Sequence, residues 1–307
     1  MGKVESRWQV SFKNILFLTD FSEPSEAALP FATSIAREYG AKVFVLHVFT
    51  PDPPVCYVPS KVAIAVIETG EQHAKARVES QLVDLEHETI ADWNTDVWEA
   101  VQRAIETNHI DLIVIGTHGR TGVEKFFMGS VVEEIFRCSP VPVLTIGPHV
   151  RTSVHGGAQF HRVLFPTDLT DASLSATPYA ISLAQENNSR LFLLHVMRSP
   201  QELNDETRND YEWKEYINSM RPFLKDAELR FPAQSLVEYG EPADRILAVA
   251  EERSSDLIVL GVRDASAHIG ATTHPERATA HKIVAQALCP VLTVSERVAT
   301  SDFVRSP

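Results

Sequence analysis

The chain repeats itself at an interval of 148 residues, and this duplication restricts its possible folds more than any other feature. Residues 15–49 and 163–197 share 15 of 35 positions at that offset, where composition alone would give roughly two. The segments DLIVIG and PVLTI of the first half recur in the same order as DLIVLG and PVLTV in the second. A unit of this size is far longer than a solenoid repeat. We therefore predict two whole domains, at residues 10–147 and 161–295.

Each unit alternates short apolar runs with amphipathic segments of helical period, which is typical of an α/β domain. Because the apolar runs are continuous, we expect a parallel sheet with helices on both faces. In the second unit, Ser235–Tyr239 marks a clear third strand. In the first unit we expect strands at 15–19, 43–48, 112–115 and 143–146, a weak third strand near 88–92, and helices at 62–88, 96–108 and 131–137.

The first helix of each unit carries a matched proline, Pro30 in one copy and Pro178 in the other. A proline inside a helix removes one hydrogen bond of the ladder and bends the helix. We therefore expect a kink at the same place in both copies. Ser22 is the expected N-cap of the first of these helices.

The charge balance restricts the partners that the protein can bind. The net charge is −13, and such a field repels phosphate backbones and acidic lipids, so we expect neither nucleic acid nor membrane as a partner. No apolar run reaches the roughly 18 residues of a membrane helix, and the N-terminus has no secretory signal pattern. Only three cysteines are present, which is typical of a reducing compartment, so we expect a cytoplasmic protein.

A glycine-rich loop in the first unit is the clearest functional signal. The stretch DLIVIGTHGRTGVEKFFMGS runs from an apolar strand into glycines at Gly116, Gly119 and Gly129, followed by Ser130. Glycines let backbone amides approach an anion closely. A loop of this kind between a parallel strand and a helix is where a phosphate group binds, so the stretch predicts a nucleotide site.

These motifs together resemble the universal stress protein family. The resemblance rests on ILFLTDFS, LHVF, DLIVIGTHGRTG, MGS and PVPVLTI in the first unit, and on VLFPTDLT, LHVM, DLIVLG and PVLTV in the second. It implies an open five-stranded sheet of order 3-2-1-4-5 in each domain. It also implies that the fifth strands of the two domains meet at a pseudo-two-fold axis, as in a homodimer of the family. A further homodimer of whole chains is left open.

The resemblance also implies a ligand, since the spacing Gly116-x2-Gly119-x9-Gly129-Ser130 matches the ATP-binding members of the family. By resemblance, Asp20 faces the ribose and adenine, and the backbone of Val48 lies beside the adenine. A bound triphosphate commonly brings Mg²⁺ with it. The phosphate contacts that the resemblance implies are the backbone amides around Gly119, Arg120, Gly129, Ser130 and Val131.

Simpler roles stay open for several of these residues. Asp20 can cap the following helix, and Arg120 can be a solvated side chain. His47 and His195 follow apolar strands in both copies and are interpreted as structural histidines. His118 is interpreted as a loop residue, and we expect no metal site and no catalytic residue.

The second unit departs from the ATP-binding pattern. Asp264 stands where Gly119 stands in the first unit, and Ala278-Thr279 takes the place of Gly129-Ser130. A carboxylate there repels a polyphosphate. Asp168 and Val196 remain, so only the adenosine half of a site is retained. We therefore expect this domain to bind ATP weakly or not at all.

The function that follows is an ATP-binding stress-response regulator with one intact site. A slow ATPase or autokinase is the alternative, and so is an interaction protein without nucleotide. The glycine loop lacks a Walker lysine-serine pair, which argues against fast phosphoryl transfer.

Overall fold

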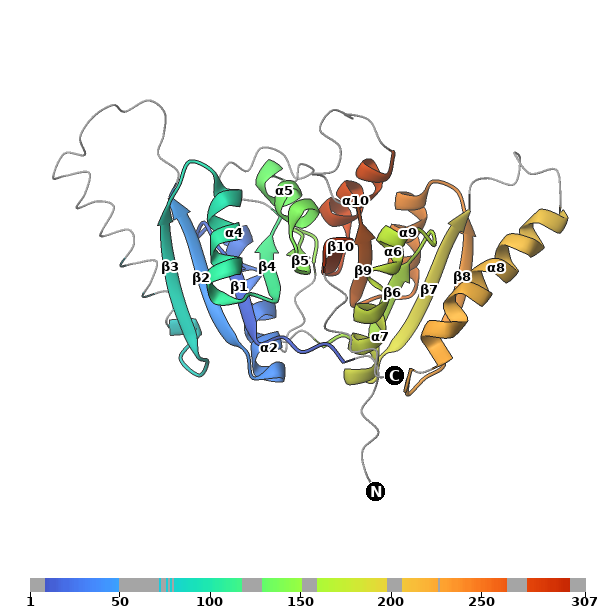
Figure 1. Cartoon of the computed structure of the whole chain (residues 1–307), viewed down its shortest axis with the longest axis horizontal. Helices are drawn as coiled ribbons and strands as arrows, with labels where there is room; N and C mark the ends of the chain where they lie inside the picture. The colour runs from blue at the N-terminus through green and yellow to red at the C-terminus, as the bar shows by residue number, and fades with distance from the viewer. Residues whose placement is uncertain are drawn as a thin grey trace, which may run out of the picture.

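The computed structural model describes residues 9–49, 72, 76, 78, 80–117, 129–150, 159–197, 206–225, 227–263 and 275–298. Figure 1 shows two similar halves that lie side by side. In the first half the strands are β1 (Asn14–Leu18), β2 (Lys42–Phe49), β3 (His87–Trp93), β4 (Leu112–Gly116) and β5 (Val143–Ile146). In the second half they are β6 (Arg162–Pro166), β7 (Arg190–Met197), β8 (Gln234–Tyr239), β9 (Leu257–Val262) and β10 (Val291–Ser295).

The helices alternate with these strands along the chain, as the sequence pattern predicts. In the first half they are α1 (Glu23–Glu26), α2 (Leu29–Tyr39), α4 (Val97–Asn108) and α5 (Ser130–Cys138). In the second half they are α6 (Asp171–Leu174), α7 (Thr177–Glu186), α8 (Glu206–Lys225), α9 (Pro242–Glu252) and α10 (Pro275–Gln286). Within the described residues, no helix is long and apolar enough to cross a membrane.

The strands form one ten-stranded sheet of order β3-β2-β1-β4-β5-β10-β9-β6-β7-β8. Each half has the order 3-2-1-4-5, which confirms the expected α/β fold, and the two five-stranded sheets merge into one. All pairs within a half are parallel, whereas β5 and β10 pair antiparallel at the centre. The fifth strands therefore meet as predicted, and neither is left as an open edge.

A pseudo-two-fold axis passes between Leu144 and Leu292, because these equivalent residues pair with each other. Thr145 and Thr293 are also equivalent, and both are buried. The Thr145 hydroxyl donates to the Val291 carbonyl at 3.0 Å, and the Thr293 hydroxyl donates to the Val143 carbonyl at 3.2 Å. The junction between the domains is thus held by two symmetric side-chain hydrogen bonds as well as by the strand ladder.

Both faces of the sheet are buried, as continuous apolar strands require. Along β1, Ile15 and Phe17 pack in one core cluster, while Leu16 and Leu18 pack in the other. Helices α2, α7 and α8 cover the first face, and α4, α5, α9 and α10 cover the second. This layered arrangement leaves the ends of the strands as the places where ligands can approach.

The expected kinks at Pro30 and Pro178 are wrong. Each proline lies in the first turn of its own helix, α2 or α7, and a separate short helix precedes it. The first helical turn needs no N–H from proline, so the residue starts a helix here instead of bending one. The predicted helix at 62–88 was also too long, because helix ends at Gln81 and Glu88 lies within β3.

Candidate functional site

The carboxyl ends of β1, β2 and β4 meet at one edge of the first domain, where the strand order reverses. Asp20 follows β1, Val48 lies near the end of β2, and Gly116 is the last residue of β4. The crevice at such a reversal is where open α/β sheets bind ligands. The structure therefore brings these three predicted site residues to one edge, whereas Gly119, Arg120 and His118 lie outside the described residues.

Asp20 is held in a tight turn at this edge. Its Oδ1 accepts hydrogen bonds from the Ser22 amide at 3.0 Å and from the Ser22 hydroxyl at 2.5 Å. The Ser22 hydroxyl oxygen also accepts from the Ser25 amide at 3.4 Å, as an N-cap does. Ser22 therefore caps the helix as predicted, and Asp20 orients the cap instead of serving as the cap itself.

The same turn recurs in the second domain around Asp168. Its Oδ1 accepts from the Thr170 amide at 3.0 Å and from the Thr170 hydroxyl at 2.6 Å, and Thr170 is the N-cap of α6. The intervening residues Phe21 and Leu169 have positive φ values of 59° and 64°. Large side chains rarely adopt this conformation, so the fold places both carboxylates at the sheet edge at a cost in backbone strain.

Helix α5 points its N-terminus toward the same edge of the first domain. Gly129 is the N-cap residue, and glycine has no side chain with which to cap this helix. Ser130 and Val131 in the first turn are exposed. The first amides of a helix have no carbonyl partner within the helix, and the helix dipole adds positive potential there. The end of α5 can therefore accept an anion.

His47 and His195 are structural residues, as the sequence interpretation held. Nδ1 of His47 lies 2.7 Å from the Thr19 carbonyl oxygen, and Nδ1 of His195 lies 2.8 Å from the Thr167 carbonyl oxygen. A carbonyl only accepts, so each Nδ1 carries the proton. These bonds tie the second strand of each domain to the turn that holds the aspartate.

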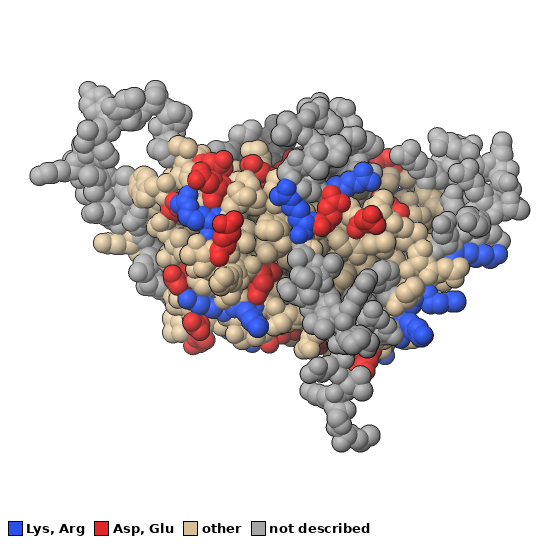
Figure 2. Space-filling model, in the orientation of Figure 1, with Lys and Arg blue, Asp and Glu red and all other residues tan. Residues whose placement is uncertain are grey.

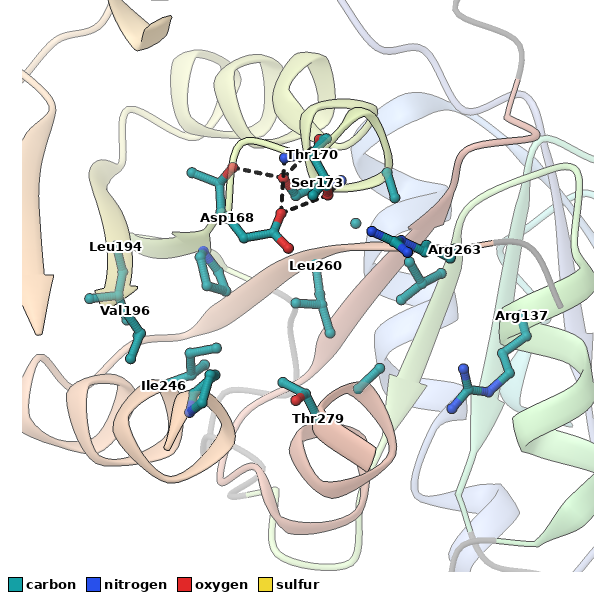
Figure 3. Close-up of a pocket in the computed structure, with 17 residues that line it drawn as sticks. Arg137, Asp168, Thr170, Ser173, Leu194, Val196, Ile246, Leu260, Arg263 and Thr279 are labelled. Atoms are coloured by element: carbon teal, nitrogen blue, oxygen red, sulfur yellow. Dashed lines mark hydrogen bonds between the residues drawn. The ribbon is translucent and has the colours of Figure 1, made fainter. Parts of the chain in front are cut away.

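The second domain contains a cavity of about 240 Å³ at its own strand ends. Figure 3 shows Asp168 and Leu260 directed into it, with Leu194, Val196 and Ile246 on its apolar side. Burial raises the pKa of Asp168, but the hydrogen bonds from Thr170 and Ser173 outweigh it, and the net pKa is lowered. The cavity is therefore lined by an ionised carboxylate on one side and by apolar side chains on the other.

The first domain contributes Arg137 to this cavity, which sequence reasoning missed. Arg137 lies near the end of α5 and is only 6% exposed. Its Nε donates to Glu133 Oε1 at 2.9 Å, and Glu133 Oε2 lies 3.2 Å from His281 Nδ1 of α10. Glu133 and His281 lie 148 residues apart, which is the interval of the duplication. Helix α5 thus has one end at the first-domain edge and its last turn at the second-domain cavity.

Helix α10 begins earlier than α5 relative to the residues that the sequence analysis compares. This helix begins at Pro275, so Ala278 and Thr279 lie within it and not at its N-terminus as Gly129 and Ser130 do in α5. Their amides can bond inside the helix and are not presented to a ligand. Asp264 lies outside the described residues.

Metal ligands do not cluster anywhere in the part of the chain that the structure describes, since no three His, Cys, Asp or Glu side chains gather there.

Comparisons with known proteins all indicate the same family. The model of the universal stress protein family matches residues 11–147 and again 159–295. Universal stress protein YxiE of Bacillus subtilis is 32% identical over 150 residues, covering 44% of this chain and 99% of its own length. A universal stress protein of Thermus aquaticus is 30% identical over 136 residues, covering 44% of this chain and 98% of its own.

One solved structure has the two-domain fold along nearly the whole chain. A universal stress protein from Archaeoglobus fulgidus aligns with 95% of this chain and 99% of its own, with a TM-score of 0.67 and 20% identity. At that identity the likeness concerns the fold alone.

Proposed function

Because the chain belongs to the universal stress protein family, we propose that it is a stress-response regulator that binds ATP in its first domain. The nucleotide lies at the carboxyl edge of β1, β2 and β4. Asp20 and the backbone of Val48 contact the adenosine, and the amides around Gly119, Arg120, Gly129, Ser130 and Val131 hold the phosphates. The protein's response to stress then depends on the occupancy of this site.

The observation that carries the proposal is the geometry of Gly129. Its φ of −62° and ψ of 142° suit any residue, and a Cβ built there meets no atom within 4 Å. The described part of the fold therefore does not require glycine at this position. A glycine next to uncapped helix amides makes physical sense when a ligand approaches the backbone closely.

We propose that the two domains differ in how they bind ATP. Its helix α10 has no free turn at Ala278-Thr279, while the cavity beside Asp168 is retained. We infer that this domain serves as the partner half of the pseudo-dimer and binds ATP far more weakly than the first.

The test is a pair of substitutions at Gly129 measured by calorimetry. Gly129→Asp places a carboxylate beside the phosphates, so we expect ATP affinity to fall by more than about 100-fold. Gly129→Ala adds a methyl group without charge, and we expect a loss below about tenfold. Thermal melting should show both variants folded, because the position has space for a side chain. Unchanged affinity in Gly129→Asp would refute the phosphate site.

A further inference from the structure

The cavity of the second domain has an acidic side chain on one side and a basic side chain from the other domain on the opposite side. In the view of Figure 3, Asp168 and Arg137 lie apart with Leu260 between them, and all three line the cavity. Among the described lining residues, the charged ones are Asp168, Arg137 and Arg263. A ligand that fills this space therefore meets an acceptor at one end and a donor at the other.

Asp168 presents an ionised carboxylate to the cavity. Both hydrogen bonds from Thr170 go to Oδ1, one from the amide at 3.0 Å and one from the hydroxyl at 2.6 Å. Partial burial raises the pKa of Asp168, but the hydrogen bonds from Thr170 and Ser173 outweigh it and hold the pKa below its usual value. Figure 3 shows the side chain directed into the cavity. Oδ2 can therefore accept a hydrogen bond from a ligand.

Arg137 is held at the cavity by groups from both domains. Its Nε donates to Glu133 Oε1 at 2.9 Å, and Glu133 Oε2 lies 3.2 Å from His281 Nδ1 of α10. In Figure 2, blue and red side chains lie next to one another at the centre of the molecule, where α5 and α10 meet in Figure 1. A guanidinium has five N–H donors in a fixed plane, so it can bind a carboxylate beside an existing partner.

The space between these two groups is apolar and large enough for a ring. Leu194, Val196, Ile246 and Leu260 line it, and its volume is about 240 Å³. An apolar cavity of roughly 150 Å³ holds one benzene ring. The cavity of the second domain therefore has room for a ring that carries a short chain.

We propose that this cavity is a binding site for a small aromatic acid with a hydroxyl group at the end opposite its carboxylate. The hydroxyl donates to Asp168, the ring lies against Ile246 and Leu260, and the carboxylate accepts from Arg137. A hydroxyl suits the site better than an ammonium group, because Arg137 and Arg263 repel a cation.

This ligand differs from the adenosine half of a nucleotide in what it needs from the protein. A purine nucleoside has no anionic group for Arg137, whereas an aromatic acid has one. Because Arg137 belongs to α5 of the first domain, the site is complete only when both domains contribute to it.

The test measures three compounds with the full chain by ligand-observed NMR, in the absence of nucleotide. The compound para-hydroxyphenylpropionate has both end groups, phenylpropionate lacks the hydroxyl, and para-propylphenol lacks the carboxylate. For the first compound we expect a dissociation constant of about 1 mM or below, as for a small ligand of moderate efficiency. The other two should bind about fivefold more weakly or worse, because each leaves one polar group of the site without its partner.

Two variants assign the end groups to their residues. Asp168→Asn should lower the affinity of para-hydroxyphenylpropionate to that of phenylpropionate, without weakening phenylpropionate itself, because only the hydroxyl contact changes. Arg137→Gln should weaken both acids by about tenfold, since bonds to charged groups are the stronger ones, and should change para-propylphenol by less than about twofold.

The matched control is Asp171→Asn, which removes the same charge from an exposed residue of α6 that does not line the cavity. It should change the affinity of each compound by less than about twofold. Thermal melting establishes that each variant is folded. If Arg137→Gln does not fold, the comparison of the three compounds in the parent chain still decides the outcome.

The proposal is overturned if para-hydroxyphenylpropionate shows no binding in the millimolar range, or if the three compounds bind equally. Losses in Asp171→Asn as large as those in Asp168→Asn would also contradict it. So would adenosine that displaces para-hydroxyphenylpropionate, binds more tightly and keeps its affinity in Arg137→Gln, because the cavity would then be a nucleoside site of one domain.

Discussion

Gly261 and Gly129 differ in the space around them. A Cβ on Gly261 would lie 2.1 Å from the Ala172 carbonyl oxygen and 2.5 Å from the Ser173 Cα. These are backbone atoms that cannot move aside, so Gly261 is required for α6 to pack against β9. Gly129 has open space around it, so packing among the described residues does not require glycine there.

The contrast predicts different effects on stability. Gly261→Ala should lower the free energy of unfolding by about 3 kcal/mol, the upper range for overpacking a tight contact. Gly129→Ala should change it by less than about 0.5 kcal/mol, as at an open surface position. Urea denaturation of the two variants beside the parent chain measures both. Similar costs at the two sites would contradict the distinction between a packing glycine and a ligand glycine.

The sequence predicted the positions of Asp20 and His47 in the fold better than their local geometry. The motif around Asp20 predicts its position after β1, and the apolar context of His47 predicts a structural role. The positive φ of Phe21 could not be predicted, because bulky residues normally avoid it. The place of Arg137 could not be predicted either, since its cavity lies in the other domain.

At the scale of elements, the two domains also touch through α2 and α7. The Tyr39 hydroxyl donates to Glu186 Oε2, and the Ser182 hydroxyl donates to Glu186 Oε1 at 2.8 Å. Burial raises the pKa of Glu186, and the bonds from Tyr39 and Ser182 reduce that rise without cancelling it. Burial, and then the charge of Glu186, raise the pKa of Glu38. Two carboxylates therefore resist ionisation at this contact.

The raised pKa values of Glu38 and Glu186 make the stability of the protein depend on pH. Between the ordinary pKa near 4.5 and the raised one, the folded protein binds more protons than the unfolded chain. Stability from this contact therefore falls as pH rises through that window, and the penalty is complete above it.

Glu38→Gln should relieve part of this penalty. We expect greater stability than the parent at pH 7, by about 0.5 kcal/mol or less because solvent screens the exposed side chain, and no difference near pH 4. Tyr39→Phe should make the stability fall more steeply as pH rises. Glu186 then loses a hydrogen-bond donor that favours its ionised form, so its pKa rises further. Denaturation curves from pH 4 to 7 measure both, and a stability gain of Glu38→Gln that grows toward low pH would contradict the assignment.

At the scale of the whole molecule, the duplication determined most of what could be predicted. It implied two α/β domains, and the family resemblance added the strand order and the meeting of the fifth strands, all confirmed by the sheet. The predicted kinks at Pro30 and Pro178 were wrong because a break between two helices and a bend in one helix have the same sequence pattern. Contacts that cross between domains, such as Glu133 with His281, depend on tertiary packing that no local pattern records.

The molecule that results is a pseudo-dimer with unequal halves. In the first half, α5 begins beside Gly129, and in the second half α10 begins at Pro275 and a cavity lies beside Asp168. Helix α5 contributes to both places, so the two halves are physically connected through one element. The central claim is that ATP occupies only the first half.

Native mass spectrometry of the full chain with saturating ATP and Mg²⁺ tests this claim most directly. The proposed asymmetry predicts one ATP for each chain, and none after Gly129→Asp. Two bound nucleotides in the parent chain, or one retained in Gly129→Asp, would contradict it.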